Sequence, residues 1–449
     1  MSNPILQSAQ SSAVVATLRE SDTVNPFIYN EKGRIVSPHS MSLLNTTKSA
    51  GSVGANSTCS FDISKNGILT GVFLEMTLPK VDLTDTNTRD NNLNETNSGT
   101  TTSDSSTATA ATAVLTSFKT QGFLAMGLLQ CIDNIVLQTS GRQIERLSRY
   151  QILARYSSLP ASKKVAVQES MRFAQQPDDG DASTNYKVVM WVPFYFFRDP
   201  LRYGYNTSFC EPLRCDVTFS DCKVLQTGNL TAGALNAHAP TDTKLVCQYR
   251  QLDARDEDAL VNAQYGDGLL SQCVSIMKEE AVHTFDSASS GLTKVSIDLK
   301  ENPCVSAIYI CVTKPDKVAN TDTYAVSLQH REVPIEIENI QLTASGVTVL
   351  DCHGDLIKYF GKWGEHDSTN VSHGNGERAF ENVYKIDFGT GGAGHTNTIA
   401  LRELSTPHLE LNVKARTAST GHEVRVMYET TTFLSTSSAT GRVQLSISS

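Results

Sequence analysis

The sequence is poor in the features that mark an enzyme or a metalloprotein. It contains no G-x-S-x-G, H-E-x-x-H or P-loop pattern. Its ten cysteines in 449 residues include no C-x-x-C pair, and this density is far below that of a disulfide scaffold. We therefore expect reduced thiols that mostly pack as small apolar groups. No catalytic, cofactor-binding or metal-binding residue is predicted, and we do not expect an enzyme.

Long apolar runs and a surplus of basic residues are also missing. The formal net charge is −9, whereas a protein that coats nucleic acid needs Lys and Arg to displace counterions from phosphates. Residues 2–20 lack the basic start and apolar centre of a signal peptide. The longest apolar run, 188–197, has half the length of a membrane span and contains Pro193. We expect no direct genome binding, and folding in a cytosol-like compartment.

A glycine-rich stretch raises the alternative of a dinucleotide enzyme. The run from Gly389 to Gly394 reads G-x-G-x-x-G directly after a strand-like pattern. A dinucleotide site needs a helix after the third glycine and a βαβ unit around it. Pro407 and the alternating pattern that starts near His408 leave little room for such a helix. This context favours a flexible loop between strands.

Two further clusters favour structural roles. Cys352, His353, His366 and His373 lie close together, but their spacing fits no standard zinc site. Four consecutive aromatic residues occupy 194–197. We expect these aromatics to form a strand that is buried by packing rather than the lining of a ligand groove.

The dominant pattern is an alternation of apolar and polar residues, which is typical of strands with one buried face. It is clearest at 294–299, 335–338, 409–414 and 423–429. Further strands are expected at 67–78, 134–140, 187–197, 213–220, 244–252 and 306–313. Helical pattern is confined to 143–156, 254–264 and 351–363. Many strands and few helices favour an antiparallel sandwich or jelly roll.

Polar segments divide the chain. Residues 83–113 are almost entirely Thr, Ser, Asn, Asp and Ala, so they cannot bury a core and are expected to form a long exposed loop. Residues 364–378 form a second polar loop, and periodicity is lost again near 221–243. The predicted organisation is an N-terminal arm at 1–24, a first jelly roll at 25–222, a linker at 223–243 and a second jelly roll at 244–449.

Several stretches, in order and spacing, resemble the double jelly-roll major capsid proteins of nucleocytoplasmic large DNA viruses and their relatives. The similar stretches are 61–80, 133–159, 192–200, 211–220, 244–260, 294–312, 355–363, 383–388, 399–413 and 422–447. Three departures from the family pattern are visible, one of which is the insert rich in Ser and Thr at 83–113. Residues 138–141 read Gln-Thr-Ser-Gly where the family usually carries Ile-Gly-Gly, and 388–397 lacks the Pro-Ser-Gly usually found nearby.

The resemblance implies an all-β chain of two consecutive eight-stranded antiparallel jelly rolls, with a few short helices and long polar loops. It implies a major capsid protein that uses no cofactor. Three chains would form a capsomer of near-hexagonal outline, and capsomers would form the icosahedral shell of a dsDNA virus. The implied partners are further copies of the chain, minor capsid and penton proteins, and an internal membrane. The implied location is the capsid shell of the virion, assembled inside the host cell.

The alternative function is a β-sandwich attachment or carbohydrate-binding protein. Such a protein shares jelly rolls and polar loops with a shell protein. It differs in predicting a ligand pocket and a secretion or fibre segment, and neither is visible in the sequence.

Overall fold

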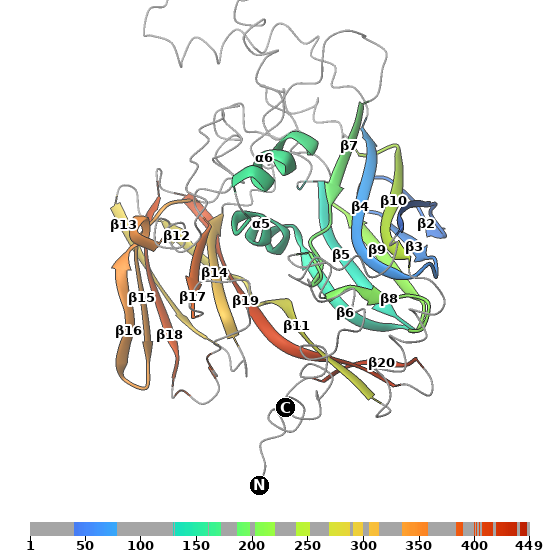
Figure 1. Ribbon diagram of the computed structural model, residues 1–449. Coiled ribbons are helices and arrows are strands. Elements are labelled where there is room, and N and C mark those ends of the chain that lie inside the picture. The colour runs from blue at the N-terminus through green and yellow to red at the C-terminus, as the bar shows by residue number, and fades with distance from the viewer. Residues whose placement is uncertain are drawn as a thin grey trace, which may run out of the picture.

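The computed structural model contains two β-sandwiches that lie side by side, with helices between them (Figure 1). The structure describes residues 40–78, 129, 131–159, 161–171, 186–197, 203–220, 239–251, 269–287, 291–299, 305–313, 335–357, 383–388, 399, 401, 404, 406–415, 419–437 and 441–446. The predicted N-terminal arm, the loop at 83–113, the polar loop at 364–378 and most of the predicted linker lie outside these residues.

The first sandwich consists of two antiparallel sheets. Sheet 1 has the order β1-β10-β4-β7 with β8 paired to β4, and sheet 2 has the order β2-β3-β9-β5-β6. The strands are β1 (Ser40–Thr46), β2 (Ala50–Gly51), β3 (Thr58–Ile63), β4 (Ile68–Leu78), β5 (Ile132–Thr139), β6 (Arg142–Ser148), β7 (Tyr186–Trp191), β8 (Tyr205–Asn206), β9 (Leu213–Phe219) and β10 (Asp242–Gln251). When the eight longer strands are counted in chain order, sheet 1 reads 1-8-3-6 and sheet 2 reads 2-7-4-5, which is a jelly roll.

The second sandwich repeats this topology. Sheet 3 has the order β11-β19-β14-β17, with β12 and β20 paired to β19, and sheet 4 has the order β13-β18-β15-β16. The strands are β11 (Leu269–Glu279), β12 (His283–Ser287), β13 (Gly291–Asp298), β14 (Val305–Thr313), β15 (Ile337–Ala344), β16 (Val347–His353), β17 (Tyr384–Asp387), β18 (His408–Ala415), β19 (Ser419–Ser437) and β20 (Val443–Ser446). Without β12 and β20, sheets 3 and 4 again read 1-8-3-6 and 2-7-4-5. The predicted fold of two eight-stranded jelly rolls is confirmed.

One strand lies in a different jelly roll from the one predicted. The sequence pattern at 244–252 was expected to open the second jelly roll, but β10 pairs with β1 and β4 and is the eighth strand of the first. Its alternation buries Leu245, Cys247 and Tyr249 against the first core. The alternation alone states only that one face is buried, so it could not assign the strand to a sheet.

Three predicted elements differ in type, and the helix expected at 254–264 lies outside the described residues. The helix expected at 351–363 begins as strand, because β16 runs to His353. The expected helix at 143–156 is split, because β6 runs to Ser148 and α5 (Arg149–Ser157) begins there with a capping box between Ser148 and Gln151. A second helix, α6 (Ala161–Ser170), follows. The aromatic run 194–197 is buried as expected, but it forms a turn after β7 and not a strand.

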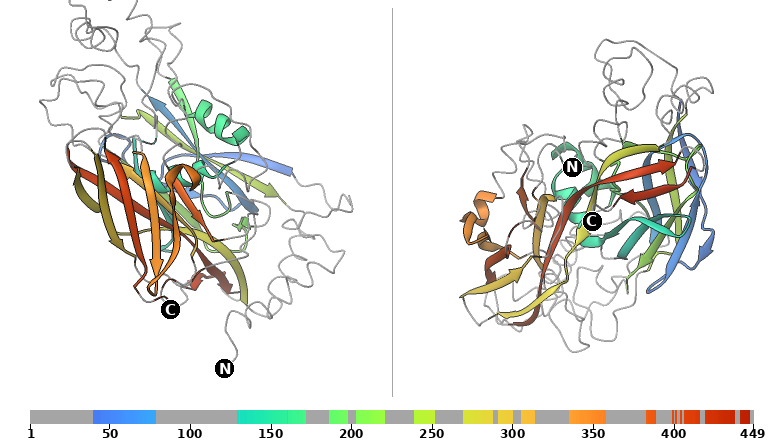
Figure 2. Two further views of the ribbon diagram at one scale, coloured as in Figure 1. Left: turned by 90° about the vertical axis from the view of Figure 1, so that its left-hand side faces the viewer. Right: turned by 90° about the horizontal axis from the view of Figure 1, so that it is seen from below.

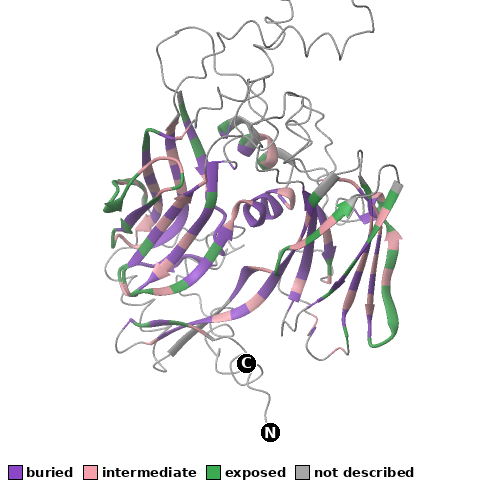
Figure 3. Cartoon of the chain, turned by 180° about the vertical axis from the view of Figure 1, so that it is seen from behind, coloured by how far each residue is buried: buried purple, intermediate pink, exposed green. Residues whose placement is uncertain are grey.

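Sheet 3 is buried on both faces. On β14, Ala307, Tyr309 and Cys311 belong to the core of the first jelly roll, whereas Ile308 and Ile310 belong to the core of the second. Figure 3 shows buried residues on the strands that face the middle of the molecule and exposed residues on the outermost strands. The two jelly rolls therefore share one sheet in their packing.

The pairing registers show that the duplication extends to single residues. The hairpin β5–β6 and the hairpin β15–β16 each have a positive-φ Ser-Gly turn and one bulge at the same distance from that turn. In sheet 1 the bulged Thr70 donates its hydroxyl to Gln248 O at 3.3 Å, and in sheet 3 the bulged Ser306 donates to Glu429 O at 3.0 Å. The matching bulges align the two jelly rolls residue by residue.

We predict that the shared sheet makes the two jelly rolls unfold together. Ile310→Ala acts on the second core and Met427→Ala on the first, and each should lower the free energy of unfolding by about 2–5 kcal/mol. Leu292 on β13 is 50% exposed, so Leu292→Ala is the control and should change it by less than about 0.5 kcal/mol. Calorimetry and urea titration should show one transition in every variant. Two separate transitions, with each substitution shifting only one, would contradict the prediction.

Candidate functional site

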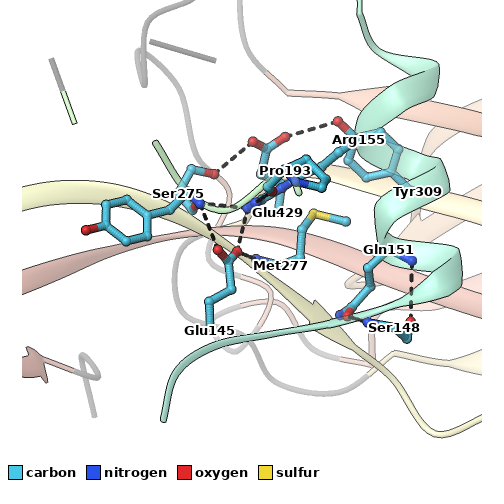
Figure 4. A network of polar contacts seen from close by, with 10 residues as sticks. Glu145, Ser148, Gln151, Arg155, Pro193, Ser275, Met277, Tyr309 and Glu429 are labelled. Carbon is cyan, nitrogen blue, oxygen red and sulfur yellow. Dashed lines mark hydrogen bonds and ion pairs between the residues drawn. The ribbon is translucent and has the colours of Figure 1, made fainter. Parts of the chain in front are cut away.

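The most elaborate polar site in the described residues lies at the junction between the jelly rolls. It combines β6 and α5 of the first jelly roll with β11, β14 and β19 of the second (Figure 4). The long strand β19 also runs past the second jelly roll toward the first (Figure 2). There Cys210 Sγ lies 3.9 Å from Thr436 Oγ1, and Glu211 N donates to Gly441 O at 3.0 Å.

A buried ion pair forms the centre of the junction. Arg155 Nη2 lies 2.6 Å from Glu145 Oε1, and the two side chains are 4% and 0% exposed. Glu145 also accepts the backbone N–H of Met277 at 3.1 Å and that of Tyr195 at 2.7 Å. Arg155 donates to the carbonyl of Ser275 at 3.1 Å and to that of Pro193. The pair thus bonds to the free edge of β11 and joins one jelly roll to the other.

Withdrawing these charges from water is costly. Burial raises the pKa of the Glu145 carboxyl above its ordinary value, while Arg155 and the N–H groups of Met277 and Tyr195 act in the opposite direction. A buried ion pair of this kind contributes little net stability, but removal of one partner leaves the other charge buried without a counter-charge. We infer that the pair fixes how the jelly rolls are oriented rather than how strongly they fold.

A second buried carboxylate lies on β19. Glu429 is 3% exposed; its two oxygens accept the hydroxyl of Ser275 at 2.8 Å and that of Tyr309 at 3.1 Å. All three residues belong to sheet 3. The carboxylate therefore bridges β11, β19 and β14 and stiffens the face that the first jelly roll covers.

The N-terminus of α5 is attached to the second jelly roll. Ser148, the N-cap of α5, donates its hydroxyl to Glu279 Oε2 at 2.8 Å. Glu279 Oε1 accepts Arg425 Nη1 at 2.8 Å, and the Arg425 guanidinium lies 4.1 Å from the centre of the Tyr150 ring. Each of these four residues, Ser148, Glu279, Arg425 and Tyr150, therefore contacts a residue of the other jelly roll.

None of these junction residues was predicted from the sequence. The candidate metal cluster lies elsewhere in the chain and is only half described, since His366 and His373 lie outside the described residues. Cys352 and His353 occupy opposite faces of β16, and the described residues hold no group of three metal-ligating side chains. The glycine-rich stretch at 389–394 is also outside the described residues. An acidic residue at an inward position of β6, Glu145, was the available signal for the junction.

The described cysteines pack as expected. Seven are free thiols, and six of these are buried. Burial raises the pKa of Cys247 to about 11 and that of Cys311 to about 12. A raised thiol pKa removes the reactive thiolate at neutral pH, so these groups act as small apolar side chains.

Within the described residues, no helix is long and apolar enough to cross a membrane. The largest exposed apolar side chains lie mostly on two surfaces at opposite sides of the chain, the outer face of sheet 1 and the β16 edge. Exposed apolar groups that gather on one surface mark contact sites with other molecules.

Comparison with known proteins gives matches at the level of the fold. No protein-family model matches the sequence, and no curated protein matches it. VP54 of PBCV-1, fitted into a reconstruction of the virophage Sputnik, has a TM-score of 0.64 and 11% identity, covering 93% of this chain and 98% of that chain. The Faustovirus major capsid protein has a TM-score of 0.56 and 9% identity, covering 96% and 98%. The mavirus major capsid protein has a TM-score of 0.53 and 8% identity, covering 94% and 93%. The chain shares the fold of these viral capsid proteins over nearly its whole length.

We predict that the junction tolerates loss of both charges better than loss of one. Glu145→Gln leaves Arg155 buried without a counter-charge and should lower the free energy of unfolding by about 3–5 kcal/mol. Glu145→Leu combined with Arg155→Met leaves no buried charge and should lower it by less. Urea denaturation of the unmodified protein, Glu145→Gln and the double variant measures the loss in the free energy of unfolding for each variant. A double variant less stable than Glu145→Gln would contradict this account.

Proposed function

We propose that the chain is a major capsid protein. The observation that carries the proposal is the duplicated jelly roll, joined through a buried junction into one unit, in the fold shared with the capsid proteins of PBCV-1, Faustovirus and mavirus. The described residues hold no group of three or more metal-ligating side chains. A building block with a rigid shape and outward contacts matches a structural role.

Three copies form the capsomer in this proposal. Two jelly rolls per chain give six similar units in a trimer, and six similar units side by side give a near-hexagonal outline. Such capsomers tile the icosahedral shell of a dsDNA virus, so the chain resides in the virion shell. Minor capsid and penton proteins and an internal membrane are the further partners. The net charge of −9 fits a shell that does not bind the genome directly.

The proposal predicts a trimer in solution. The purified full-length chain should have three times the mass of one chain in light scattering, and negative-stain images should show particles of near-hexagonal outline that form flat arrays. A stable monomer whose melting temperature rises with one sugar would instead indicate a carbohydrate-binding protein. A monomer at all concentrations would rule out the capsomer.

A further inference from the structure

The two jelly rolls contact each other through different surfaces. The first contributes the edge strand β6 and the first turn of α5, and the second contributes the outer face and free edge of sheet 3. Because the topology is duplicated, each jelly roll has both kinds of surface. Among the described residues of one chain only one pair of these surfaces is used, so the β16 edge of the second jelly roll and the outer face of sheet 1 are not covered by other described residues.

The strand-pairing registers identify the residues on these two surfaces that are equivalent to the junction residues. The hairpin bulges align β6 with β16, and the bulges at Thr70 and Ser306 align sheet 1 with sheet 3. Strands β1 and β11 follow through their pairing with β10 and β19. The equivalent positions, with the junction residue first, are Glu145 and Leu350, Tyr150 and Asp355, Met277 and Leu43, Tyr309 and Phe73, Met427 and Val246, and Arg425 and Lys244.

Burial differs sharply between equivalent positions. Met277 is 4% exposed at the junction, whereas its equivalent Leu43 is 57% exposed. Ile144 on β6 is 3% exposed, whereas its equivalent Val349 on β16 is 49% exposed. Eight large apolar side chains are exposed in the described residues, and six belong to the two remaining surfaces. These six are Met41, Leu43 and Val189 on sheet 1 and Val347, Val349 and Leu356 on β16 and the turn after it.

We propose that the outer face of sheet 1 binds the β16 edge of a second copy of this chain, in the same way as sheet 3 binds β6 and α5 within one chain. The inference rests on the proposed function and names the surfaces through which its capsomer forms. Each copy presents one surface of each kind, so the contact is heterologous, and a heterologous contact generates a ring when its rotation closes. Three copies place six jelly rolls in that ring.

The chemistry of this contact differs from that of the junction. Leu350 replaces the buried Glu145, so the contact between copies lacks the buried ion pair and is mainly apolar. At the junction the guanidinium of Arg425 lies over the ring of Tyr150. The equivalent pair is Lys244 of one copy and Asp355 of the next, which have opposite charge. Their side chains are 41% and 49% exposed in the single chain, where Lys244 Nζ lies 3.7 Å from Asp242 Oδ2 and Asp355 Oδ2 lies 3.7 Å from His353 Nδ1.

Charge reversal tests the pairing of Lys244 with Asp355. Lys244→Glu and Asp355→Lys each place like charges together and should raise the dissociation constant of the trimer about tenfold or more, because like charges across an interface cost several kcal/mol. The double variant restores opposite charges across the contact, so its dissociation constant should return most of the way to that of the unmodified chain. Lys294→Glu is the control, since Lys294 lies on β13 and is 61% exposed away from both surfaces. Sedimentation of full-length proteins over a dilution series gives the constants.

The outcomes separate this inference from the proposed function. The unmodified chain could form trimers while the single and double variants dissociate like the control. In that case these surfaces do not form the contact between copies, but the proposal of a trimeric capsomer is retained. If the unmodified chain stays monomeric at all concentrations, both proposals fail. Circular dichroism of each variant checks that the fold is retained.

Cross-linking between two differently marked chains gives an independent measurement. A chain with Leu43→Cys is mixed with a chain with Val349→Cys, and a short bismaleimide is added after exchange of subunits. A linked dimer that contains both marks is expected. The parent chain controls for Cys352, and a mixture of Leu43→Cys with Leu292→Cys should give no link, since Leu292 lies on β13. Equal linking in both mixtures would overturn the proposal.

Discussion

The burial of sheet 3 on both faces is the constraint on which the rest of the structure depends. Alternate residues of β14 and β19 belong to different cores, so neither jelly roll is complete without this sheet. Separation of the two units would expose Ala307, Tyr309 and Met427 to water, at about 25 cal/mol per Å² of apolar surface. The chain is therefore one structural unit and not two domains on a tether.

The ion pair of Glu145 and Arg155 adds direction to this apolar contact. Apolar faces can slide over one another, because the hydrophobic effect has no preferred geometry. Bonds from both charged groups to the backbone of β11 allow a single register. The equivalent positions carry Leu350, which is partly buried against the second core, and the exposed Leu43 and Lys244. In the contact that we propose between copies, these positions therefore lack the buried ion pair that joins the two jelly rolls inside the chain.

The fold class could be predicted from the sequence, but the junction could not. The alternation of apolar and polar residues in β13, β15, β18 and β19 was sufficient to predict strands there, because this pattern depends only on residues that are close in sequence. The assignment of β10 failed because its alternation is satisfied by either sheet. The partners of Glu145 could not be predicted because Met277 lies 132 residues away and offers only its backbone. The internal repeat was visible, as N-I-x-L-x-x-S-G occurs at 134–141 and 339–346, but it became informative only with the pairing registers.

The strand order also governs how the chain folds during synthesis. In both jelly rolls the eighth strand, β10 or β19, fills the position between the first and third strands. Until that strand leaves the ribosome, β1 and β4, and later β11 and β14, each have an open edge on the inside of the sheet. Neither sheet can close from its N-terminal strands alone, and the second supplies the face that covers the first jelly roll. Closure of sheet 3 therefore depends on β19, which begins at Ser419, and a polypeptide that ends before Ser419 keeps the gap between β11 and β14 although β10 has already closed sheet 1.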